Sequence, residues 1–324
     1  MDSRGAQGAN IAPDADPSPA ADAAWRNPSI ADYVRLFRPK QWSKNLLVFA
    51  AYIFAARFTD PEATRLVLIA FAAMCLLSSG TYALNDVLDR GRDRQHPEKR
   101  SRPLASGAIP AAIGAILGAA LVVGGLALVI AFLNSSSLAI VAAYLGIQAL
   151  YNTVLKRVPI ADVFSIALGF VLRAVLGAAA IWAPVSGWLL FCTGALALML
   201  GFAKRRHEFL IQGQDRASSR ESLVGYSKAA LDALVIITAT AAALCYGIYA
   251  IDSSTARKYP ALILTTLFVV YGVARYVLLV FSRDEGGEPA DVLLKDPHIL
   301  GSVLLFVAAS VVAVSGVSIP LLEQ

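Results

Sequence analysis

Long apolar blocks alternate with polar, charged connections along almost the whole chain of 324 residues. A helix needs about 20 mostly apolar residues to cross a bilayer. Within lipid the backbone groups of such a block must pair with one another, so only helices fit the pattern. We therefore predict an all-α integral membrane protein with nine membrane-spanning helices within residues 29–324. The blocks, of which the first is short, lie at about 45–58, 66–88, 110–132, 136–155, 160–182, 187–203, 229–251, 260–282 and 299–320.

The composition excludes several classes of protein. Hydrophobic residues make up 57% of the chain and charged residues only 16%, whereas soluble domains average about 25% charged residues. A soluble enzyme, a disordered chain and a secreted disulfide scaffold are therefore excluded. Residues 1–28 differ from the rest, because they are rich in Ala, Asp, Pro and Ser and lack the apolar run of a signal peptide. We expect a disordered cytoplasmic tail there.

The positive charges predict an orientation in the membrane. Of the 28 Lys and Arg residues, 22 fall in the N-terminal segment and in every second connection. Basic residues mark the cytoplasmic side, so the N-terminus and the long connections at about 89–109, 204–228 and 283–298 are predicted to be cytoplasmic, in the inner (plasma) membrane. The net charge of +5 is explained by these positions, and no nucleic-acid partner is expected. Long polar connections on one face indicate an active site there.

An acidic face is predicted at the end of the second block. Asn85, Asp86, Asp89 and Asp93 fall within an arc of about 100° on a helix. Three carboxylates on one face repel each other, and negative charge is unfavourable near a helix C-terminus. A magnesium ion bound by these four residues would relieve both conflicts, since oxygen ligands suit Mg²⁺. The alternative is a solvated acidic face paired with neighbouring arginines.

A basic run at residues 96–104 follows the acidic face and contains Arg102. A metal ion beside cationic side chains is typical of sites for phosphate esters and diphosphates.

The pattern Asn-Asp-x-x-Asp-x-x-x-Asp at residues 85–93 resembles the UbiA-type prenyltransferase superfamily. Residues 38–45, Arg-Pro-Lys-Gln-Trp-Ser-Lys-Asn, and 102–104, Arg-Pro-Leu, match it as well. The resemblance extends from about residue 33 over nearly the whole chain. It implies a UbiA-type helical bundle with a cytoplasmic active-site mouth, in which the acidic motif holds magnesium against a diphosphate. It also points to Asp162, because an Asp is common at that position in the superfamily.

The chain departs from the superfamily pattern after the sixth block. Typical members carry a second Asp-x-x-x-Asp there, whereas this chain has Lys-Arg-Arg-His-Glu at residues 204–208. This departure and residues 151–156, Tyr-Asn-Thr-Val-Leu-Lys, resemble the subgroup that transfers 5-phosphoribosyl from phosphoribosyl pyrophosphate (PRPP) to decaprenyl phosphate for cell-wall arabinan precursors. The resemblance implies that Asp89, Asp93, Lys204 and Arg205 are catalytic. The substrate contacts that it implies are Lys44, Asn85, Arg102, Tyr151, Lys156, Asp162, Lys204, Arg205 and Glu208.

Other interpretations remain open at this point. Ordinary membrane anchors are an alternative interpretation of the basic cluster at 204–206, of Tyr151 and of Lys156. A conventional UbiA enzyme that prenylates an aromatic or haem acceptor, and a transporter, are the alternative functions. The intramembrane Arg173 could contact a lipid phosphate or form a structural pair, while Arg275 is expected to pack structurally. A homo-oligomer is compatible with the sequence, and the polyprenyl chain length is not determined by it.

Overall fold

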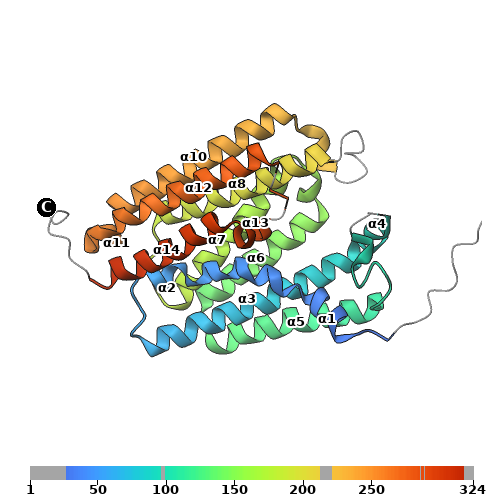
Figure 1. Ribbon diagram of the computed structural model, residues 1–324. Helices are drawn as coiled ribbons and strands as arrows, with labels where there is room; N and C mark the ends of the chain where they lie inside the picture. Colours follow the sequence, from blue (N-terminus) through green and yellow to red (C-terminus); the bar gives the residue numbers. More distant parts are fainter. Residues whose placement is uncertain (1–26, 96–98, 212–220, 285, 288, 317–324) are drawn as a thin grey trace, which may run out of the picture.

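The apolar blocks fold into a bundle of long helices, shown by a computed structural model that describes residues 27–95, 99–211, 221–284, 286–287 and 289–316 (Figure 1). All regular elements in these ranges are helices, as predicted. The predicted tail at residues 1–28 lies outside the described residues except for its last two positions. Ser29 then caps helix α1, Ile30–Phe37, through a reciprocal hydrogen-bond pair with Asp32.

Seven segments of the described chain are long and apolar enough to span a membrane. Most of their bounds match the predicted blocks within two residues, but α3 begins five residues earlier and α14 ends six residues earlier. Helix α8 continues eight residues past the predicted end and so carries the basic cluster at 204–206 within the helix. The seven are α3 (Pro61–Leu88), α5 (Ala111–Phe132), α7 (Ala161–Ala180), α8 (Gly187–Ile211), α10 (Lys228–Asp252), η5 with α12 (Pro260–Thr265 and Thr266–Ser282) and α14 (Pro297–Val314).

The two remaining predicted blocks form elements of a different kind. The first consists of a 3₁₀ helix, η1 (Pro39–Phe49), followed by the short α2 (Ala50–Phe54). The fourth is α6 (Ser135–Thr153), which has 19 residues and polar side chains near both ends. Neither is among the seven candidate spans of the described residues, so the count of nine membrane-spanning helices stays a prediction.

Short elements connect the long helices at both ends of the bundle. They carry several of the polar residues discussed below. These elements are α4 (Arg90–Gln95), η2 (Lys99–Ser101), η3 (Leu155–Arg157), η4 (Glu221–Gly225), α11 (Ser254–Lys258) and α13 (Pro289–Lys295).

Glycines set the closest helix contacts. Between α3 and α5, a Cβ atom on Gly80 would lie 2.7 Å from the carbonyl oxygen of Gly118, and one on Gly125 would lie 2.7 Å from Leu77. Small residues at such positions let helix backbones approach each other in membranes. The tightest case is Gly177 of α7, where an added Cβ would lie 1.8 Å from the carbonyl oxygen of Val48 in η1. The position of η1 therefore depends on the absence of a side chain at Gly177.

We expect Gly177→Ala to destabilise the bundle by about 1–3 kcal/mol, the usual cost of overpacking, because η1 has to move away from α7. Thermal unfolding of the protein in detergent measures this loss. Gly146→Ala is the matched control, since no atom lies within 4 Å of an added Cβ there. Equal transition temperatures for the two variants would contradict the close contact.

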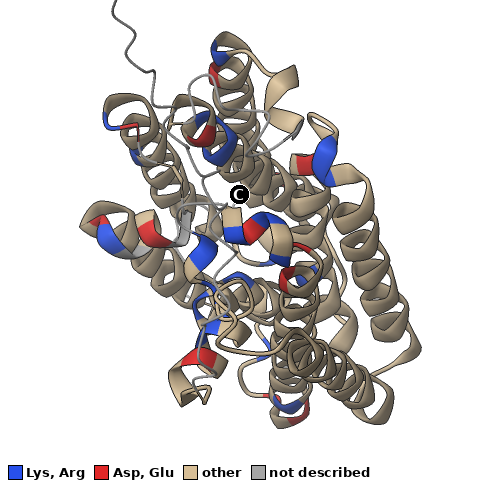
Figure 2. Cartoon of the chain, turned by 90° about the vertical axis from the view of Figure 1, so that its right-hand side faces the viewer, with Lys and Arg blue, Asp and Glu red and all other residues tan. Residues whose placement is uncertain are grey.

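The charged side chains that join elements far apart in sequence gather at one end of the bundle. This end contains the C-terminus of α3, the N-terminus of α7 and the C-terminal part of α8, which are linked there by ion pairs. Figure 2 looks at the molecule from the right-hand side of Figure 1 and shows Lys, Arg, Asp and Glu on the connections and helix ends that face the viewer. The site is built at this end.

Candidate active site

Helix α3 ends inside the acidic motif. Leu88 is its last residue, and Asp89 has φ −90° and ψ 2° before α4 begins at Arg90. The motif was predicted on one continuous helix face, whereas the structure divides it between two helices. The hydrogen bond from the Asp93 N–H to the Asp89 carbonyl at 2.9 Å keeps the turn compact. Asp86 and Asp93 are consequently buried, and Asp89 is half-buried.

Each carboxylate of the motif is paired with a cation from another part of the chain. Asp86, only 3% exposed, accepts hydrogen bonds from Nη2 of Arg38 at 2.5 and 2.7 Å. Arg102 donates to Asp86 at 3.1 Å and to Asp93 at 2.8 Å. Nζ of Lys156, in η3, donates to Asp89 at 2.8 Å. The structure therefore brings the predicted residues Arg102 and Lys156 onto the acidic motif.

Arg38 is a site residue that the sequence analysis did not select. It has φ 52° and ψ 55°, a left-handed conformation that is uncommon for a residue other than glycine. Its guanidinium also lies over the ring of Tyr82, 5.3 Å from the ring centre. Strained backbone of this kind is often found at functional sites. The sequence feature that could have identified Arg38 is the Arg-Pro pair at residues 38–39, directly after an amphipathic helix.

The basic cluster in α8 is divided between two environments. Arg205 is 1% exposed and Lys204 is half-buried. Nε of Arg205 lies 3.1 Å from Oδ2 of Asp162, and Nη1 pairs with Glu208 one helical turn away. Arg205 and Glu208, both among the expected substrate contacts, thus form an ion pair with each other. Arg205 and Asp162 were both expected to contact substrate, but here they form a buried pair with each other.

Asp162 has further partners that the sequence did not indicate. It is fully buried and accepts hydrogen bonds from Ser222 at 3.0 Å and Tyr226 at 3.2 Å. Burial raises the pKa of Tyr226 to about 12, so its hydroxyl keeps its proton and donates. These contacts attach η4 and the start of α10 to α7. The geometry favours a positioning role for Asp162, because its carboxylate lies among protein donors.

Arg206 forms a separate structural clamp beside this pair. Its guanidinium is buried and contacts Asp232 of α10 at 2.6 Å and Asp284, after α12, at 2.8 Å. Arg206 therefore joins α8, α10 and the end of α12, and its charge is compensated within the protein.

Arg173 is buried in the middle of α7 and makes contacts with neutral groups. Nε donates to Oδ1 of Asn45 at 2.7 Å, Nη1 to the Gly169 carbonyl at 2.6 Å, and Nη2 to the Tyr144 hydroxyl at 3.2 Å. Of the two roles left open by the sequence, these contacts fit the structural one. They also attach η1, through Asn45, to the bundle. Arg275 packs structurally as expected, paired with Asp296 at 2.8 Å.

The remaining predicted residues are Lys44, Tyr151 and Asn85. Lys44 is half-buried on η1, next to Asn45, and Tyr151 is half-buried near the end of α6. Asn85 differs from both, because its Oδ1 atom is buried and has no hydrogen-bond partner among the described residues. A buried acceptor without a partner is unfavourable, so Asn85 is suited to a ligand or a metal ion.

The residues present suit a magnesium ion in their chemistry. In the described ranges, no three His, Cys, Asp or Glu side chains form a group that could hold a metal ion in this arrangement, because the carboxylates are turned toward Arg38, Arg102 and Lys156. The donors are nevertheless all oxygens, as Mg²⁺ prefers, and the orphaned Oδ1 of Asn85 adds one more. The predicted metal ligands Asn85, Asp86, Asp89 and Asp93 therefore remain candidates.

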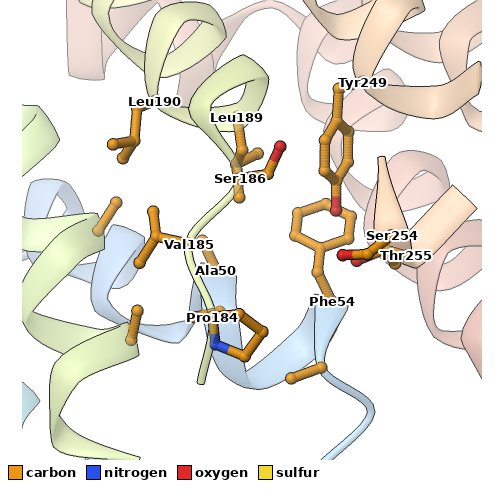
Figure 3. Close-up of a pocket in the computed structure, with 14 residues that line it drawn as sticks. Ala50, Phe54, Pro184, Val185, Ser186, Leu189, Leu190, Tyr249, Ser254 and Thr255 are labelled. Atoms are coloured by element: carbon orange, nitrogen blue, oxygen red, sulfur yellow. The ribbon is translucent and has the colours of Figure 1, made fainter. Parts of the chain in front are cut away.

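A small cavity lies away from the charged end. It is formed where α7 ends and α8 begins, beside α2 and α11, whereas Asp162 and Arg205 lie at the opposite ends of α7 and α8. Figure 3 shows Phe54, Pro184 and Leu189 around it, with the hydroxyls of Ser254 and Thr255 at one side. Its lining combines apolar side chains with hydroxyls and contains none of the acidic or basic residues discussed above.

The bundle and its charged end define a multi-pass membrane protein with a polar site at one end of its helices. The model of the UbiA prenyltransferase family matches residues 46–295. The decaprenyl-phosphate phosphoribosyltransferase of Mycolicibacterium smegmatis is 32% identical over 282 residues, which cover 82% of this chain and 87% of that protein. The protein of the same name from Corynebacterium glutamicum is 31% identical, with 87% and 86% covered. The chain belongs to the UbiA prenyltransferase family.

Solved structures agree with this fold. A UbiA homologue from Archaeoglobus fulgidus, bound to GPP and Mg²⁺, aligns with a TM-score of 0.68 at 18% identity, and the alignment covers 88% of this chain and 99% of that one. A digeranylgeranylglyceryl phosphate synthase aligns with a TM-score of 0.62 at 20% identity, covering 87% and 98%. At these identities the likeness concerns the fold.

Proposed function

We propose that this protein transfers the 5-phosphoribosyl group of PRPP to decaprenyl phosphate, or a similar polyprenyl phosphate, and releases pyrophosphate. The observation that carries the proposal is the identity of about 31–32% with two decaprenyl-phosphate phosphoribosyltransferases along most of the chain. The charged end supports it, because acidic oxygens for a metal ion and several cations for phosphates lie together there. The proposed product would supply the arabinan precursors of a cell wall.

The proposed reaction exchanges one bond at C1 of the ribose. An oxygen of the lipid phosphate forms a bond to C1, while the bond from C1 to the pyrophosphate oxygen breaks and its electrons leave with pyrophosphate. A magnesium ion bound by Asn85, Asp86, Asp89 and Asp93 would neutralise charge on the leaving group. The lipid phosphate is already anionic at neutral pH, so no general base is needed. Positioning and electrostatic stabilisation then supply the catalysis.

The cations of the site would hold the phosphates of the donor. Arg38, Arg102 and Lys156 lie on the acidic motif, and a guanidinium binds phosphate with two parallel hydrogen bonds. Lys44 and Lys204 would add charge from η1 and α8. In this proposal Arg205 has a positioning role and does not contact the donor. Its pair with Asp162 holds α8 against α7.

The orientation belongs to the same proposal. The excess of Lys and Arg near the charged end supports a cytoplasmic location for the site and the N-terminus, in the inner membrane. A water-soluble donor such as PRPP would then reach the site from the cytoplasm. The polyprenyl tail would remain in the lipid, since the transfer of hydrocarbon from lipid to water is unfavourable. Assembly into a homo-oligomer is compatible with this arrangement.

Incubation of the purified protein with labelled PRPP and Mg²⁺ tests the function directly. One reaction contains decaprenyl phosphate, and a parallel reaction contains a prenyl diphosphate with an aromatic acceptor. We expect labelled lipid and pyrophosphate in the first reaction alone. Prenyl transfer in the second would instead support the conventional UbiA chemistry, and activity in neither would leave a transporter as the better description.

We expect Lys204→Ala to raise the KM for PRPP about tenfold, because a hydrogen bond to a charged group contributes about 1.5–3 kcal/mol. The KM for the lipid should change much less, since Lys204 is proposed to contact the donor. Steady-state kinetics on correctly inserted protein measure both constants. Lys228→Ala is the control, because it removes an exposed basic residue near the same end of the bundle. Unchanged kinetics for Lys204→Ala would show that the lysine is only a topology signal.

A further inference from the structure

One nitrogen atom of Arg102 lies between two carboxylates of the acidic motif. Nη1 is 3.1 Å from Oδ1 of Asp86 and 2.8 Å from Oδ2 of Asp93. Both carboxylates are buried, with side-chain exposures of 3% and 6%. Two oxygens from different turns of the chain thus share a single positively charged neighbour, which is the arrangement that a bridging metal ion makes with two carboxylates.

A magnesium ion and Arg102 cannot hold these two oxygens at the same time. Mg²⁺ binds carboxylate oxygens at about 2.0–2.1 Å, so an ion that bridges Asp86 and Asp93 would lie where Nη1 lies now. Arg38 shares Oδ1 of Asp86 with Arg102, since its Nη2 donates to that oxygen at 2.5 Å and to Oδ2 at 2.7 Å. Among the described residues, however, Arg102 is the cation that contacts both Asp86 and Asp93. Arg102 is therefore the cation that the metal ion has to replace.

Arg102 is also the cation that can leave. Its side chain is 30% exposed, compared with 24% for Arg38 and 15% for Lys156. The guanidinium can therefore turn toward a phosphate at the mouth, whereas the two buried carboxylates need another cation once it has left. Without Arg102, Asp86 keeps its pair with Arg38, while Asp93 loses its ion pair and can accept a metal ion.

We propose that Arg102 is a built-in counter-cation, which occupies the bridging position in the empty enzyme and is drawn away by the phosphates of the donor when the metal ion binds. The proposal rests on the proposed function only in taking a phosphate-bearing donor. It makes metal and donor binding mutually dependent: the donor raises the affinity for the metal ion, and by linkage the metal ion raises the affinity for the donor by the same factor.

Binding of Mn²⁺, a paramagnetic substitute for Mg²⁺, tests the proposal without turnover. Electron paramagnetic resonance counts the free ion during a titration of the donor-free protein. We expect Arg102→Gln to lower the dissociation constant for Mn²⁺ about tenfold relative to the wild type, equivalent to about 1.4 kcal/mol. Arg102→Lys keeps the positive charge and should bind Mn²⁺ nearly as weakly as the wild type.

Arg100→Gln is the matched control, because it removes the same charge from the same connection, and Arg100 is exposed. Equal Mn²⁺ affinities for Arg102→Gln and Arg100→Gln would overturn the proposal. If Arg102→Gln unfolds, which its thermal transition would reveal, Arg102→Met takes its place, because Met keeps the aliphatic stem without the charge. The same tenfold tighter Mn²⁺ binding relative to Arg100→Gln is expected, and equal affinities would overturn the proposal.

The coupling is tested by adding PRPP while the free Mn²⁺ concentration is held constant with a buffer. The wild type and Arg102→Gln should then converge in Mn²⁺ affinity, because the donor has removed Arg102 from the wild-type site. A tenfold difference that persists with PRPP bound would contradict the coupling. Failure of the proposed function would look different: phosphoribosyl transfer would be absent, while the donor-free Mn²⁺ affinities would still separate Arg102→Gln from its control.

Discussion

Asp93→Asn is expected to lower kcat about 10²–10³-fold, the loss that follows removal of one element of electrostatic stabilisation in an active site. Asn keeps the shape of the side chain but removes the charge that would bind a metal ion and that pairs with Arg102. Asp89→Asn should behave similarly, because Asp89 faces Lys156 across the same mouth. Activity should also disappear with EDTA and return with Mg²⁺.

A surface pair at a distant position supplies the control for these variants. Asp252 and Arg257 form an ion pair in which both side chains are more than half exposed, and such pairs contribute about 0–1 kcal/mol to stability. Asp252→Asn should therefore keep both the activity and the thermal transition of the wild type. Near-normal turnover in both Asp89→Asn and Asp93→Asn would refute the metal-site assignment.

The second large effect concerns stability. Arg205→Met is expected to reduce the free energy of unfolding by about 3–5 kcal/mol, as found when one partner of a buried ion pair is removed. Asp162, fully buried, would then keep its hydrogen bonds from Ser222 and Tyr226 but lose its cation. Denaturant or thermal unfolding in detergent measures the change. Lys204→Ala, at the neighbouring half-buried position, should be far less destabilising.

A double variant shows whether the loss comes from the unpaired charge. Asp162→Asn together with Arg205→Met removes both charges and should recover part of the stability lost in Arg205→Met alone. The direct substrate role suggested by the family resemblance makes the opposite prediction. It requires Arg205→Met to keep its stability and to raise the KM for PRPP, and that result would show that Arg205 turns toward the donor.

The local features of this protein were predictable from its sequence, and the long-range pairs were not. Apolar length alone located seven long helices, with most bounds within two residues, because lipid imposes a similar length on every crossing. The exceptions are the start of α3 and the ends of α8 and α14. The spacing of Asp86, Asp89 and Asp93 identified the acidic motif. Their partners Arg38 and Lys156 lie 48 and 67 positions away in the chain, and no local pattern specifies such pairings.

The structure differs from the prediction at two further points, for physical reasons that the sequence pattern does not reveal. The helix break at Asp89 reflects the backbone of that residue, which has φ −90° and ψ 2°, whereas helical spacing assumes a continuous helix. The burial of Arg205 depends on Asp162, which lies at the start of another helix. A basic cluster next to an apolar block has the same sequence appearance whether its members face solvent or an internal carboxylate.

The 3₁₀ geometry of η1 changes how the first block meets the membrane. Every third residue of this segment is buried, namely Asn45, Val48, Ala51 and Phe54. This spacing matches the three residues per turn of a 3₁₀ helix, and the first two of these residues lie in η1. At a rise of about 2.0 Å per residue, the 11 residues of η1 extend about 22 Å. With the 5 residues of α2 at about 1.5 Å each, the segment approaches the roughly 30 Å thickness of the hydrocarbon core.

The predicted first crossing would therefore be made by a stretched helix, over a distance for which its residue count is too small as an α-helix. Inserting one residue before Asn45 would rotate the following buried row by about 120° and carry the Asn45 amide away from Arg173. The contact with this buried guanidinium thus constrains the length of the segment, so natural variation in it should consist of substitutions and not of insertions or deletions.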